Sequence, residues 1–407
     1  MTKEKLIIAV IFGGRSVEHD VSILTGLQFL DALDQSRYQG LPLYVDPDGQ
    51  WWTGDLLLKR SLYPHSADTR ARLTPVTLPL GTSIRGRPHL MASQKGFLGS
   101  KAITIPFDLI VPAIHGSNGE DGSLQGLLSF TGIPYAGCRP LGAAATMDKH
   151  VTKEALKTRN IPLLPHILVE KPAAGTFLSR DTILPQMEAK LGADMFPVIV
   201  KPRRLGSSVG VTIARDADGL DAALSSIFRM DTGALIEPLV PNLVEYNIAV
   251  MRKDGQVITS AIEKPLNGSD MLDFNTKYRA GSNGAPKLDE APSDGMASLN
   301  RELNPAELSE GQDGLIRSAA STAFDLLDLA GTVRIDFLCN AKTGELWLNE
   351  VNSIPGSFAY FLWQTAQDPL SFTDLSRTIV EEGMVLSRAE KGETGTAIGN
   401  ARIFGRD

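Results

Sequence analysis

Four polar side chains toward the carboxyl end of the chain have the residue types of a divalent-cation site. They lie in two predicted strands, VRIDFLC and ELWLNEVN, and alternation along each strand puts all four on one face of a hairpin. The four are Arg334, Asp336, Glu350 and Asn352. Magnesium prefers carboxylate and carboxamide oxygens and keeps part of its coordination for phosphate. The pattern predicts a magnesium site facing a polyphosphate; the alternative is a solvated hairpin face with an incidental salt bridge.

The register of this hairpin depends on its turn. If Ala341 pairs with Glu345, the loop is 342–344, and Gly344 supplies the left-handed position that a three-residue loop needs. This register places the two carboxylates opposite each other and the arginine opposite the asparagine. The other face carries side chains expected in the core: Val333, Ile335, Phe337, Trp347 and Val351.

A strand followed by a helix start brings one more carboxylate to a position typical of ligand binding. Residues 6–12 are continuously apolar, which predicts a buried parallel strand, and Gly13-Gly14 makes the turn after it. Ser16 is a good N-cap, and apolar residues recur at helical spacing from Val17 onward. Glu18 then lies in the first turn, where open α/β sheets bind ligands. The alternative is that Glu18 only complements the helix dipole.

A glycine-rich segment follows a second predicted buried strand, Phe107 to Ile114. The segment is HGSNGEDG (115–122), and it leads into an apparent helix, SLQGLLSF (123–130). Glycines between a strand and a helix are typical of a ligand loop, although a plain connecting loop explains the composition equally well. Between the two strands, residues 61–102 are rich in Pro, Gly, Arg and Ser, which predicts loops with a few short strands.

Two lysines in the middle of the chain indicate an anionic ligand. Lys149 stands at the start of a predicted helix (147–156), where it opposes the helix dipole; simple solvation is the alternative. Lys201 ends the strand PVIVK and precedes a Gly/Ser loop, 206–210, whose backbone N–H groups can line up on phosphate oxygens. This is not the P-loop pattern, and a flexible Gly-Ser turn is the other interpretation.

The last third of the chain supplies the remaining predicted elements. Residues 234–252 predict a strand, a short loop and a strand, with Glu237 and Glu245 near the junctions. Residues 264–294 form a long Gly/Ser/Asn/Pro-rich loop, and such loops are functional or disordered. A helix is predicted over 308–329. The tail from about Ser387 lacks an apolar period and is predicted to be poorly ordered.

Composition narrows the class of protein. The chain has 407 residues, 43% hydrophobic and 21% charged, with a net charge of -7, which argues against a general nucleic-acid binder. Two distant cysteines, Cys138 and Cys339, favour a reduced, cytoplasmic protein. No apolar run reaches the roughly 20 residues of a membrane span. The N-terminal apolar run predicts a first strand and not a signal peptide.

In combination, these motifs resemble the D-alanine–D-alanine ligases of the ATP-grasp superfamily, from Leu6 to about Leu362. The motifs are GGRSVEHDVS, HGSNGEDGSLQG, GIPYAG…MDK, VIVKPRRLGSSVG, FNTKYRAGS and RIDF…LNEVNSIPG, in the family's order. The resemblance implies an α/β fold: an N-terminal Rossmann-like domain with a parallel sheet (1–136) and two ATP-grasp subdomains. These would span 137–236 and 237–386, with a lid loop at 264–294 and a tail at 387–407.

The resemblance also implies a reaction and a role for each site residue. ATP would phosphorylate the first D-alanine, and the amino group of the second would attack the acylphosphate. Residues implied to bind two magnesium ions, or manganese, are Asp336, Glu350 and Asn352. Those implied to bind ATP are Lys149, Lys201, Gly206, Ser208, Glu237, Leu239, Glu245 and Lys277. Those implied to act in catalysis or lid locking are Glu18, Ser207, Tyr278, Arg334 and Gly356. Those implied to contact the amino-acid substrates are His115, Phe361 and Leu362.

Three positions depart from the family pattern. Phe361 stands where members usually carry a serine that helps hold the second substrate's carboxylate, so the identity of that substrate is open. Leu205 stands where a glutamate is frequent, and Ser129 where an acidic residue is frequent. The leading hypothesis is a ligase for cell-wall precursors that takes small-molecule substrates, binds no nucleic acid or membrane, and forms a homodimer as family members commonly do. The alternatives are a related ligase with a changed second substrate and a non-catalytic ATP-binding relative.

Overall fold

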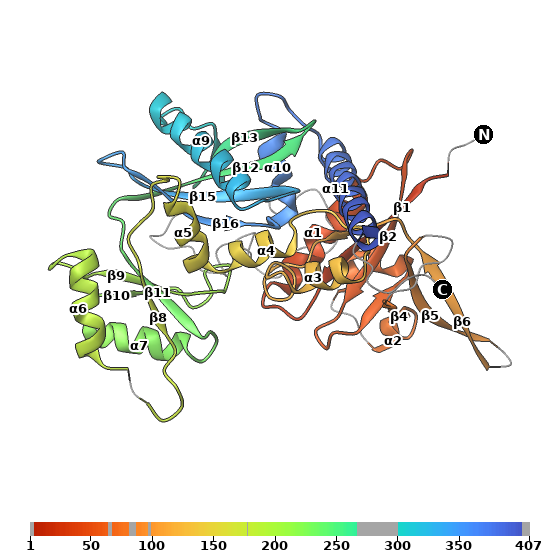
Figure 1. Cartoon of the computed structure of the whole chain (residues 1–407), viewed down its shortest axis with the longest axis horizontal. Coiled ribbons are helices and arrows are strands. Elements are labelled where there is room, and N and C mark those ends of the chain that lie inside the picture. Colours follow the sequence, from red (N-terminus) through yellow and green to blue (C-terminus); the bar gives the residue numbers. More distant parts are fainter. Residues whose placement is uncertain are drawn as a thin grey trace.

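The structure, a computed structural model, describes residues 4–63, 67–80, 87–96, 99–176, 178–266 and 300–400. Figure 1 shows the sheets of this described part along the long axis, with β8–β11 at the left end, β1–β7 at the right end and β12–β16 between them. The predicted α/β class, with parallel strands in the N-terminal part, is confirmed.

The first sheet combines parallel and antiparallel strands. Its order is β6-β5-β4-β3-β2-β1-β7, and β1 pairs in parallel with β2 and β7. The strands are β1 (Leu6–Gly13), β2 (Tyr38–Val45), β3 (Trp51–Thr53), β4 (Thr74–Thr77), β5 (His89–Gly96), β6 (Gly99–Pro106) and β7 (Leu109–Pro112). The predicted buried strands at 6–12 and 107–114 are confirmed as β1 and β7. The region 61–102 is more regular than predicted, because β5 and β6 form an antiparallel hairpin of eight-residue strands.

Alternation along β1 explains the layers around this sheet. Ile8, Val10 and Phe12 point into one core with helix α1 (His19–Ala32), whereas Ala9 and Ile11 point into a second core with helix α3 (Ser123–Phe130). Both faces of β1 are therefore covered, as a continuous apolar run requires. Three short helical turns follow β3 in the chain: η1 (Asp55–Leu58), η2 (Arg60–Leu62) and α2 (Ala67–Arg70).

The second sheet is antiparallel and lies in the middle of the chain. Its order is β10-β9-β11-β8. Its elements are β8 (Ile167–Glu170), β9 (Val198–Pro202), β10 (Thr212–Ala214), β11 (Gly233–Pro238), α6 (Arg180–Leu191) and α7 (Ala217–Ile227). The two helices close one face through Ile183, Met187, Leu220 and Leu224. The loop between β9 and β10 carries the predicted phosphate-binding residues Gly206 and Ser208.

The third sheet is also antiparallel and has the order β14-β13-β12-β15-β16. Its strands are β12 (Leu243–Lys253), β13 (Gln256–Pro265), β14 (Arg301–Leu303), β15 (Thr332–Asn340) and β16 (Leu346–Asn352). Helix α9 (Glu310–Leu326) covers one face, and a capping box between Ser309 and Gln312 fixes where it begins. The helix predicted over 308–329 is confirmed. The connecting helices are α4 (Pro140–Met147), α5 (Lys149–Lys157), η5 (Gly356–Ala359) and α10 (Tyr360–Trp363).

The β15–β16 hairpin pairs its site residues as predicted but closes differently. Asp336 lies opposite Glu350, as expected, yet the register shifts by one residue after that pair. Asn340 therefore pairs across the turn with Glu345, and the loop has one residue more than predicted; the proposed Ala341–Glu345 pairing is wrong. Gly344 does take the left-handed conformation, with φ 76°.

The register shift also corrects the predicted core. It inserts Asn349 between the site pair and the rest of the strand, so that side-chain alternation inverts along β16. Leu346 and Leu348 pack in the core with Val351, whereas Trp347, predicted to be there, is only half-buried.

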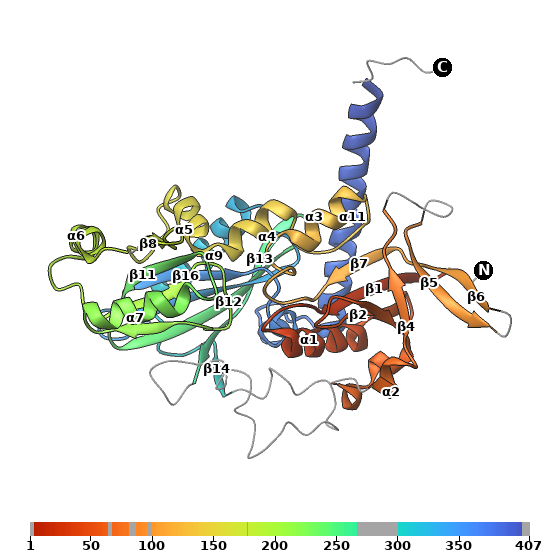
Figure 2. The same cartoon turned by 90° about the horizontal axis from the view of Figure 1, so that it is seen from below.

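The carboxyl-terminal segment is the clearest error of sequence-based prediction. Residues 387–400 continue helix α11 (Phe372–Asn400), which Figure 2 shows running away from the body of the molecule, whereas residues 401–407 of the predicted tail lie outside the described residues. Its beginning is ordered by burial and by contacts: the Ser387 hydroxyl accepts a hydrogen bond from the Tyr135 N–H, and Glu390 pairs with Arg139 at 2.6 Å. The divisions at 136/137 and 236/237 stay predictions; β11 runs across the second, to Pro238.

Two further expectations concern redox state and membranes. Cys138 and Cys339 are both buried free thiols. Among the helices that the structure describes, none has the length and apolar character needed to cross a bilayer.

Candidate active site

One cavity collects side chains from all three sheets. It is lined by Glu18, Glu120, Thr146, Met147, Lys149, Leu205, Gly206, Glu350, Val351, Asn352 and Ser353. Five of these were predicted as site residues from separate motifs: Glu18, Lys149, Gly206, Glu350 and Asn352. The structure therefore brings together segments up to more than 300 residues apart in the chain.

Glu18 reaches the cavity from the turn between β1 and α1. Helix α1 begins at His19, so Glu18 precedes its first turn instead of lying in it. Ser16 is not the N-cap that was predicted; its hydroxyl accepts from the Glu18 N–H at 3.1 Å and shapes the preceding turn. Val17, predicted on the apolar face, is 57% exposed.

Two loops converge on the Glu18 carboxylate. The Ser207 hydroxyl donates a hydrogen bond to it from the β9–β10 loop. A Cβ atom at Gly116 would lie 2.5 Å from its Oε2, and one at Gly206 would lie 3.1 Å away. Gly116 also has φ +70°, so both backbone conformation and space favour glycine there.

Glu120 is a second carboxylate in the cavity, and sequence reasoning missed it. Its oxygens accept hydrogen bonds from the Gly116 N–H at 2.8 Å, the Ile354 N–H at 2.9 Å and the Ser353 hydroxyl at 3.3 Å. Burial and the nearby charge of Glu18 raise the pKa of Glu120 to about 8. The side chain is therefore protonated at neutral pH, and it ties the 115–122 loop to the segment after β16. The acidic residue within GEDG was the available signal.

His115 is held as a neutral ring beside this loop. Its Nε2 lies 2.9 Å from the Thr25 hydroxyl, and burial lowers the pKa of His115 to about 4. The same Thr25 oxygen accepts a hydrogen bond from the Ser357 N–H at 3.0 Å. One α1 side chain thus positions both the histidine and the start of the 356–362 segment.

Lys149 is the first residue of α5, as predicted, and its ammonium group points across the cavity. It donates to the Leu205 carbonyl at 2.7 Å and lies 4.0 Å from Glu350. Burial lowers the pKa of Lys149, and the nearby Lys201 opposes its charge as well. Asp148 caps the helix by accepting from the Val151 N–H at 3.2 Å. Lys149 is half-buried and Lys201 is buried, and two cations this close together favour the binding of an anion.

Lys201 belongs to a buried charge cluster. Glu237 is fully buried and pairs with Lys153 at 2.8 Å and with Lys201 at 2.6 Å. Burial alone would raise the pKa of Glu237, but the two ammonium groups lower it to about 2. Lys201 also donates to Asn349 at 2.9 Å, which links the second sheet to the hairpin of the third. Leu239 follows β11, and Glu245 lies on β12. The predicted contacts of Glu237, Leu239 and Glu245 with ATP stay predictions.

From the hairpin, Glu350 and Asn352 line the cavity, and Asp336 lies beside them on β15. Arg334 donates two hydrogen bonds to the Asp336 carboxylate, both at 2.7 Å. The Asn352 amide donates to the same carboxylate at 3.1 Å. Asp336 is buried, and Glu350 and Asn352 are half-buried at the cavity. Two carboxylates and a carboxamide therefore present their oxygens within one short patch of sheet.

The segment after the hairpin has an unusual backbone. Ser357, Phe358 and Ala359 have φ values of 54°, 52° and 51°, and such left-handed residues cost about 1–2 kcal/mol each. The Ser357 hydroxyl donates to Gln28 at 2.6 Å, and the Phe358 ring packs 4.8 Å from that of Phe29. These contacts with α1 hold the strained turn and set the position of the Gly356 backbone.

Phe361 and Leu362 turn their side chains into the core. Phe361 is 6% exposed, and the guanidinium carbon of Arg301 lies 3.8 Å from its ring centroid. Arg301 also pairs with Glu263 at 3.3 Å. Leu362 is fully buried. Contact of these two residues with a substrate stays a prediction.

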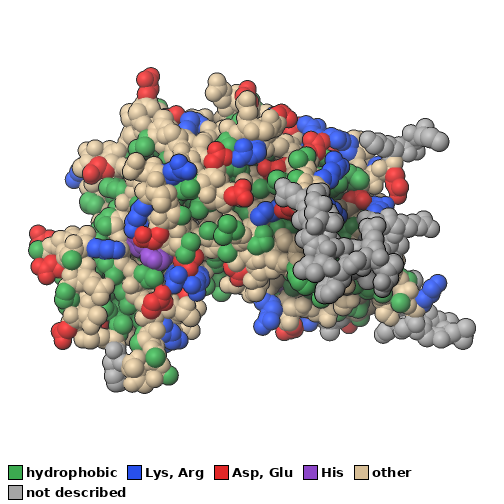
Figure 3. Space-filling model, viewed as in Figure 1, with side chains coloured by type: hydrophobic (Ala, Val, Ile, Leu, Met, Phe, Trp, Pro, Cys, Tyr) green, Lys and Arg blue, Asp and Glu red, His purple; other side chains and the backbone are tan. Residues whose placement is uncertain are grey.

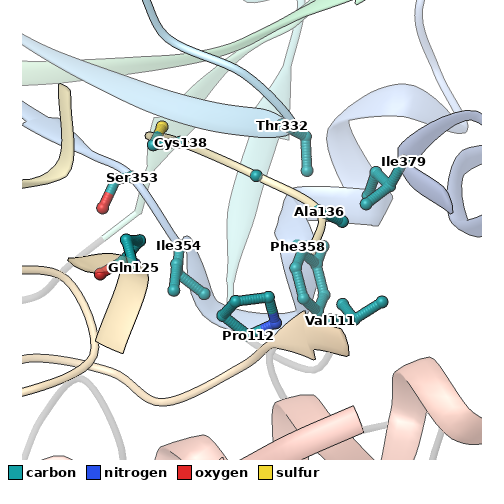
Figure 4. A pocket seen from close by; sticks show the side chains of 12 residues that line it. Val111, Pro112, Gln125, Ala136, Cys138, Thr332, Ser353, Ile354, Phe358 and Ile379 are labelled. Atoms are coloured by element: carbon teal, nitrogen blue, oxygen red, sulfur yellow. The ribbon is translucent and has the colours of Figure 1, made fainter. Parts of the chain in front are cut away.

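A second hollow lies behind the active-site segment and is mainly apolar. Figure 4 shows Val111, Pro112, Ile354, Phe358 and Ile379 turned toward one another there, with Gln125 and Cys138 at its side. Its lining includes residues of the 353–358 segment, of β7 and of α11, and none of these lining residues is charged. Two predicted site residues, Lys277 and Tyr278, lie outside the described residues, as does most of the predicted lid loop.

The fold and the site define a class of protein. Segments of two antiparallel sheets line one cavity: the Gly/Ser loop after β9 comes from one sheet and the hairpin with Glu350 and Asn352 from the other, with Lys149 of α5 beside them. The arrangement of the sheets is that of the ATP-grasp fold. Residues 7–138 match the family model for the D-ala D-ala ligase N-terminus, and residues 155–381 that for the C-terminus. The chain belongs to the D-alanine–D-alanine ligase family, and it is an ATP-dependent ligase.

Individual relatives agree along most of the chain. A D-alanine–D-alanine ligase of Thermosipho africanus is 33% identical over 359 residues, covering 88% of each protein. One of Staphylococcus epidermidis is 32% identical over 385 residues, 94% of this chain and 95% of the relative. The solved D-alanine–D-alanine ligase of Coxiella burnetii has a TM-score of 0.77 at 22% identity, over 98% of this chain and all of that one, and shares the fold. The VanG D-Ala:D-Ser ligase of Enterococcus faecalis has a TM-score of 0.69 at 25% identity, over 93% and 100% of the two chains.

Proposed function

We propose that this protein is an ADP-forming D-alanine–D-alanine ligase that supplies the dipeptide for a peptidoglycan precursor. One observation carries the proposal: Glu18, Lys149 and Glu350, from three separate motifs, line a single cavity. An amino-acid ammonium group, a polyphosphate and a divalent cation need these three kinds of group within reach of one another. Because the reaction consumes ATP, we place it in the cytoplasm, and a homodimer stays part of the proposal by family resemblance.

The first half of the proposed reaction joins the first D-alanine to phosphate. Glu18, held by Ser207, binds the substrate's ammonium group, and neutral His115 lies near its carboxylate as a hydrogen-bonding partner. Lys149 and Lys201 bind the phosphate oxygens, together with N–H groups of the 206–210 loop. Phosphoryl transfer depends on such positioned cations more than on a nucleophilic side chain.

The second half transfers the acyl group to the acceptor amine. Arg334 and the Gly356 N–H stabilise the negative charge that develops on the carbonyl oxygen. Arg334 is already oriented by its two hydrogen bonds to Asp336, and the Gly356 backbone by the contacts of Ser357 with α1. Groups fixed in advance lose little freedom when the charge forms, which is why they lower the barrier.

The hairpin residues fit a hard divalent cation. Asp336, Glu350 and Asn352 offer only oxygen ligands, the set that magnesium and manganese prefer, and Lys149 stands 4.0 Å from Glu350 on the phosphate side. We propose that these three residues hold two magnesium ions. When bound, the ions neutralise phosphate charge and align the transferred group.

A second candidate concerns the acceptor. The buried Phe361 provides no hydroxyl where the family usually has one, so a D-amino acid other than D-alanine is a competing second substrate. The similarity to a D-Ala:D-Ser ligase makes D-serine the first alternative to test.

Phosphate release and product mass test both candidates. The protein is incubated with ATP, magnesium and D-alanine alone, and then with D-alanine plus D-serine, D-lactate or bulkier D-amino acids; Glu350→Gln is the inactive control. The proposal expects D-alanyl-D-alanine as the main product. If another acceptor gives a coupled product (a dipeptide, or an ester-linked depsipeptide with D-lactate) and D-alanine alone gives none, the altered-acceptor ligase replaces this proposal. Absence of ADP with every pair would identify a non-catalytic relative.

A further inference from the structure

A second cluster of ligand-type side chains lies away from the catalytic cavity. It consists of His150 and Glu154 on helix α5 and of His166, which directly precedes β8. None of the three lines the active-site cavity. Figure 3 shows histidine at the surface of this part of the molecule, beside acidic and basic side chains.

Local structure explains why the three side chains meet. His150 and Glu154 are four residues apart on one helix and therefore share a face. His166 comes from the returning chain, where Lys190 donates to its carbonyl at 2.9 Å and fixes the backbone. The two imidazole rings lie edge to face, with centroids 5.2 Å apart. His150 and Glu154 on α5 therefore face the imidazole of His166, which the segment before β8 holds in place.

The three ligand atoms have the spacing of a coordination sphere. His150 Nδ1 lies 2.9 Å from His166 Nε2, and Glu154 Oε1 lies 3.4 Å from His166 Nε2 and 4.0 Å from His150 Nδ1. The point equidistant from these atoms is about 2.0 Å from each, which matches zinc–nitrogen and zinc–oxygen bonds of roughly 2.0–2.2 Å.

The surroundings suit a partly open metal site. The His166 side chain is 1% exposed, whereas those of His150 and Glu154 are 29% and 45% exposed, so that solvent can supply a further ligand. Two imidazoles with one carboxylate favour zinc over magnesium, which prefers oxygen ligands.

We propose that His150, Glu154 and His166 bind a zinc ion that clamps helix α5 to the start of β8. The site is separate from the proposed magnesium site and goes beyond the ligase reaction. Its place in the fold gives it a structural consequence, because α5 begins with Lys149 and also carries Lys153, the partner of Glu237. A fixed α5 keeps both lysines in position.

An explanation without metal must be separated from this one. A hydrogen bond between the two imidazoles and an ion pair between Glu154 and Lys157 would also draw the groups together. The two explanations differ in the effect of Lys157. Under the zinc proposal its ammonium group competes with the metal for Glu154, and its removal strengthens zinc binding.

The test measures zinc directly on the full chain. Protein stripped with a chelator is titrated with Zn²⁺ against a chromophoric competitor, with excess Mg²⁺ present to occupy oxygen-only sites. We expect one Zn²⁺ per chain. His150→Asn and Glu154→Gln should each weaken binding by more than about a hundredfold, since even indirect partners of metal ligands contribute about 10- to 100-fold. Lys157→Met should bind as well as or better than the parent.

Two controls show whether the bound zinc belongs to the cluster of His150, Glu154 and His166. Glu350→Gln removes a carboxylate from the catalytic cavity and should leave zinc affinity unchanged, while circular dichroism verifies that every variant is folded. Co²⁺ in place of zinc should give the intense visible bands of a four- or five-coordinate ion in the parent, in Glu350→Gln and in Lys157→Met, but not in His150→Asn or Glu154→Gln. The proposal is overturned if the parent does not bind zinc stoichiometrically, or if Glu350→Gln abolishes binding while His150→Asn retains it.

Discussion

Replacing Glu237 by glutamine should destabilise this protein far more than removing a surface carboxylate. The side chain is fully buried, and its partners Lys153 and Lys201 are 1% and 7% exposed. Loss of the charge leaves two buried ammonium groups without their counter-ion. Breaking a buried ion pair from one side costs about 3–5 kcal/mol, because the remaining charge stays desolvated.

The acid dependence of stability reports on the same ion pairs of Glu237 with Lys153 and Lys201. The pKa of Glu237 falls from 4.5 to about 2 in the folded protein. A depressed carboxyl pKa adds stability that is complete above pH 4.5 and is lost as the pH falls toward 2. The lowered pKa of Glu237 has the direction expected when two ammonium groups stabilise its ionised form in the folded protein, although burial lowers the pKa of its partner Lys153 and opposes that gain.

Urea unfolding at pH 7, followed by circular dichroism, measures the effect. The first unfolding transition is compared among variants, because a chain of several sheets need not unfold in one step. Asp218→Asn is the matched control, since Asp218 pairs with Arg180 at the surface and should contribute no more than about 1 kcal/mol. Adding Lys153→Met to the Glu237→Gln variant should recover part of the loss, because one unpaired cation is then removed.

The kinetic result should follow the structural one. Lys201 loses its partner, so the KM for ATP should rise in Glu237→Gln more than the KM for D-alanine. An unfolding midpoint equal to that of the Asp218→Asn variant would refute the reasoning. So would a double variant that is less stable than Glu237→Gln alone.

Four further predictions test other parts of the site. Glu350→Gln should reduce turnover at least about a hundredfold, or ~2.7 kcal/mol at the barrier, with an unchanged circular dichroism spectrum; near-normal turnover contradicts the metal assignment. Glu120 has its pKa raised to about 8 from 4.5, so its stabilising protonated form is lost as the pH rises through 8. Glu120→Gln should therefore melt higher than the parent at pH 9 and equally at pH 5. Phe361→Ser should lower the KM for the second D-alanine, leave the first site unchanged, and cost about 3–5 kcal/mol of stability because a buried ring is removed; an unchanged acceptor KM in the folded variant argues against an acceptor site there. Gly116→Ala should raise the KM for the first amino acid, whereas Gly132→Ala, with a similar φ of +66° but open space around its Cβ, should not; equal effects would mean that backbone strain alone is responsible.

Much of the fold and many site positions could be predicted because they depend on local patterns. The apolar run at 6–12 and the helix at 123–130 follow from periodicity and glycine boundaries, and both are present as expected. The prediction for the tail was wrong because it also relied on local pattern, and residues beyond Ser387 show no apolar period. There the helix is continued from an upstream packed segment and tied down by contacts such as that of Glu390 with Arg139.

The hairpin shows how a correct pairing can follow from an incorrect turn. Strict alternation from an Ala341–Glu345 closure leads to the Asp336–Glu350 pair, which the structure contains. The real loop is one residue longer, and the register shift at Asn349 compensates for it. The two errors cancel at the carboxylates but not beyond the bulge, where Trp347 was placed on the wrong face.

The groups that sequence reasoning missed are those whose meaning depends on distant neighbours. Lys153 lies one helical turn from Lys149, and only the approach of β11 pairs it with Glu237. Glu120 looks like any acidic loop residue until Ile354 approaches to donate its N–H. Chemistry-bearing residues can thus be located from their own motifs, whereas their charge states arise from tertiary burial. The protonated Glu120 and the ionised, doubly paired Glu237 are both buried glutamates, and only the cations or anions that the fold places beside each of them make the difference.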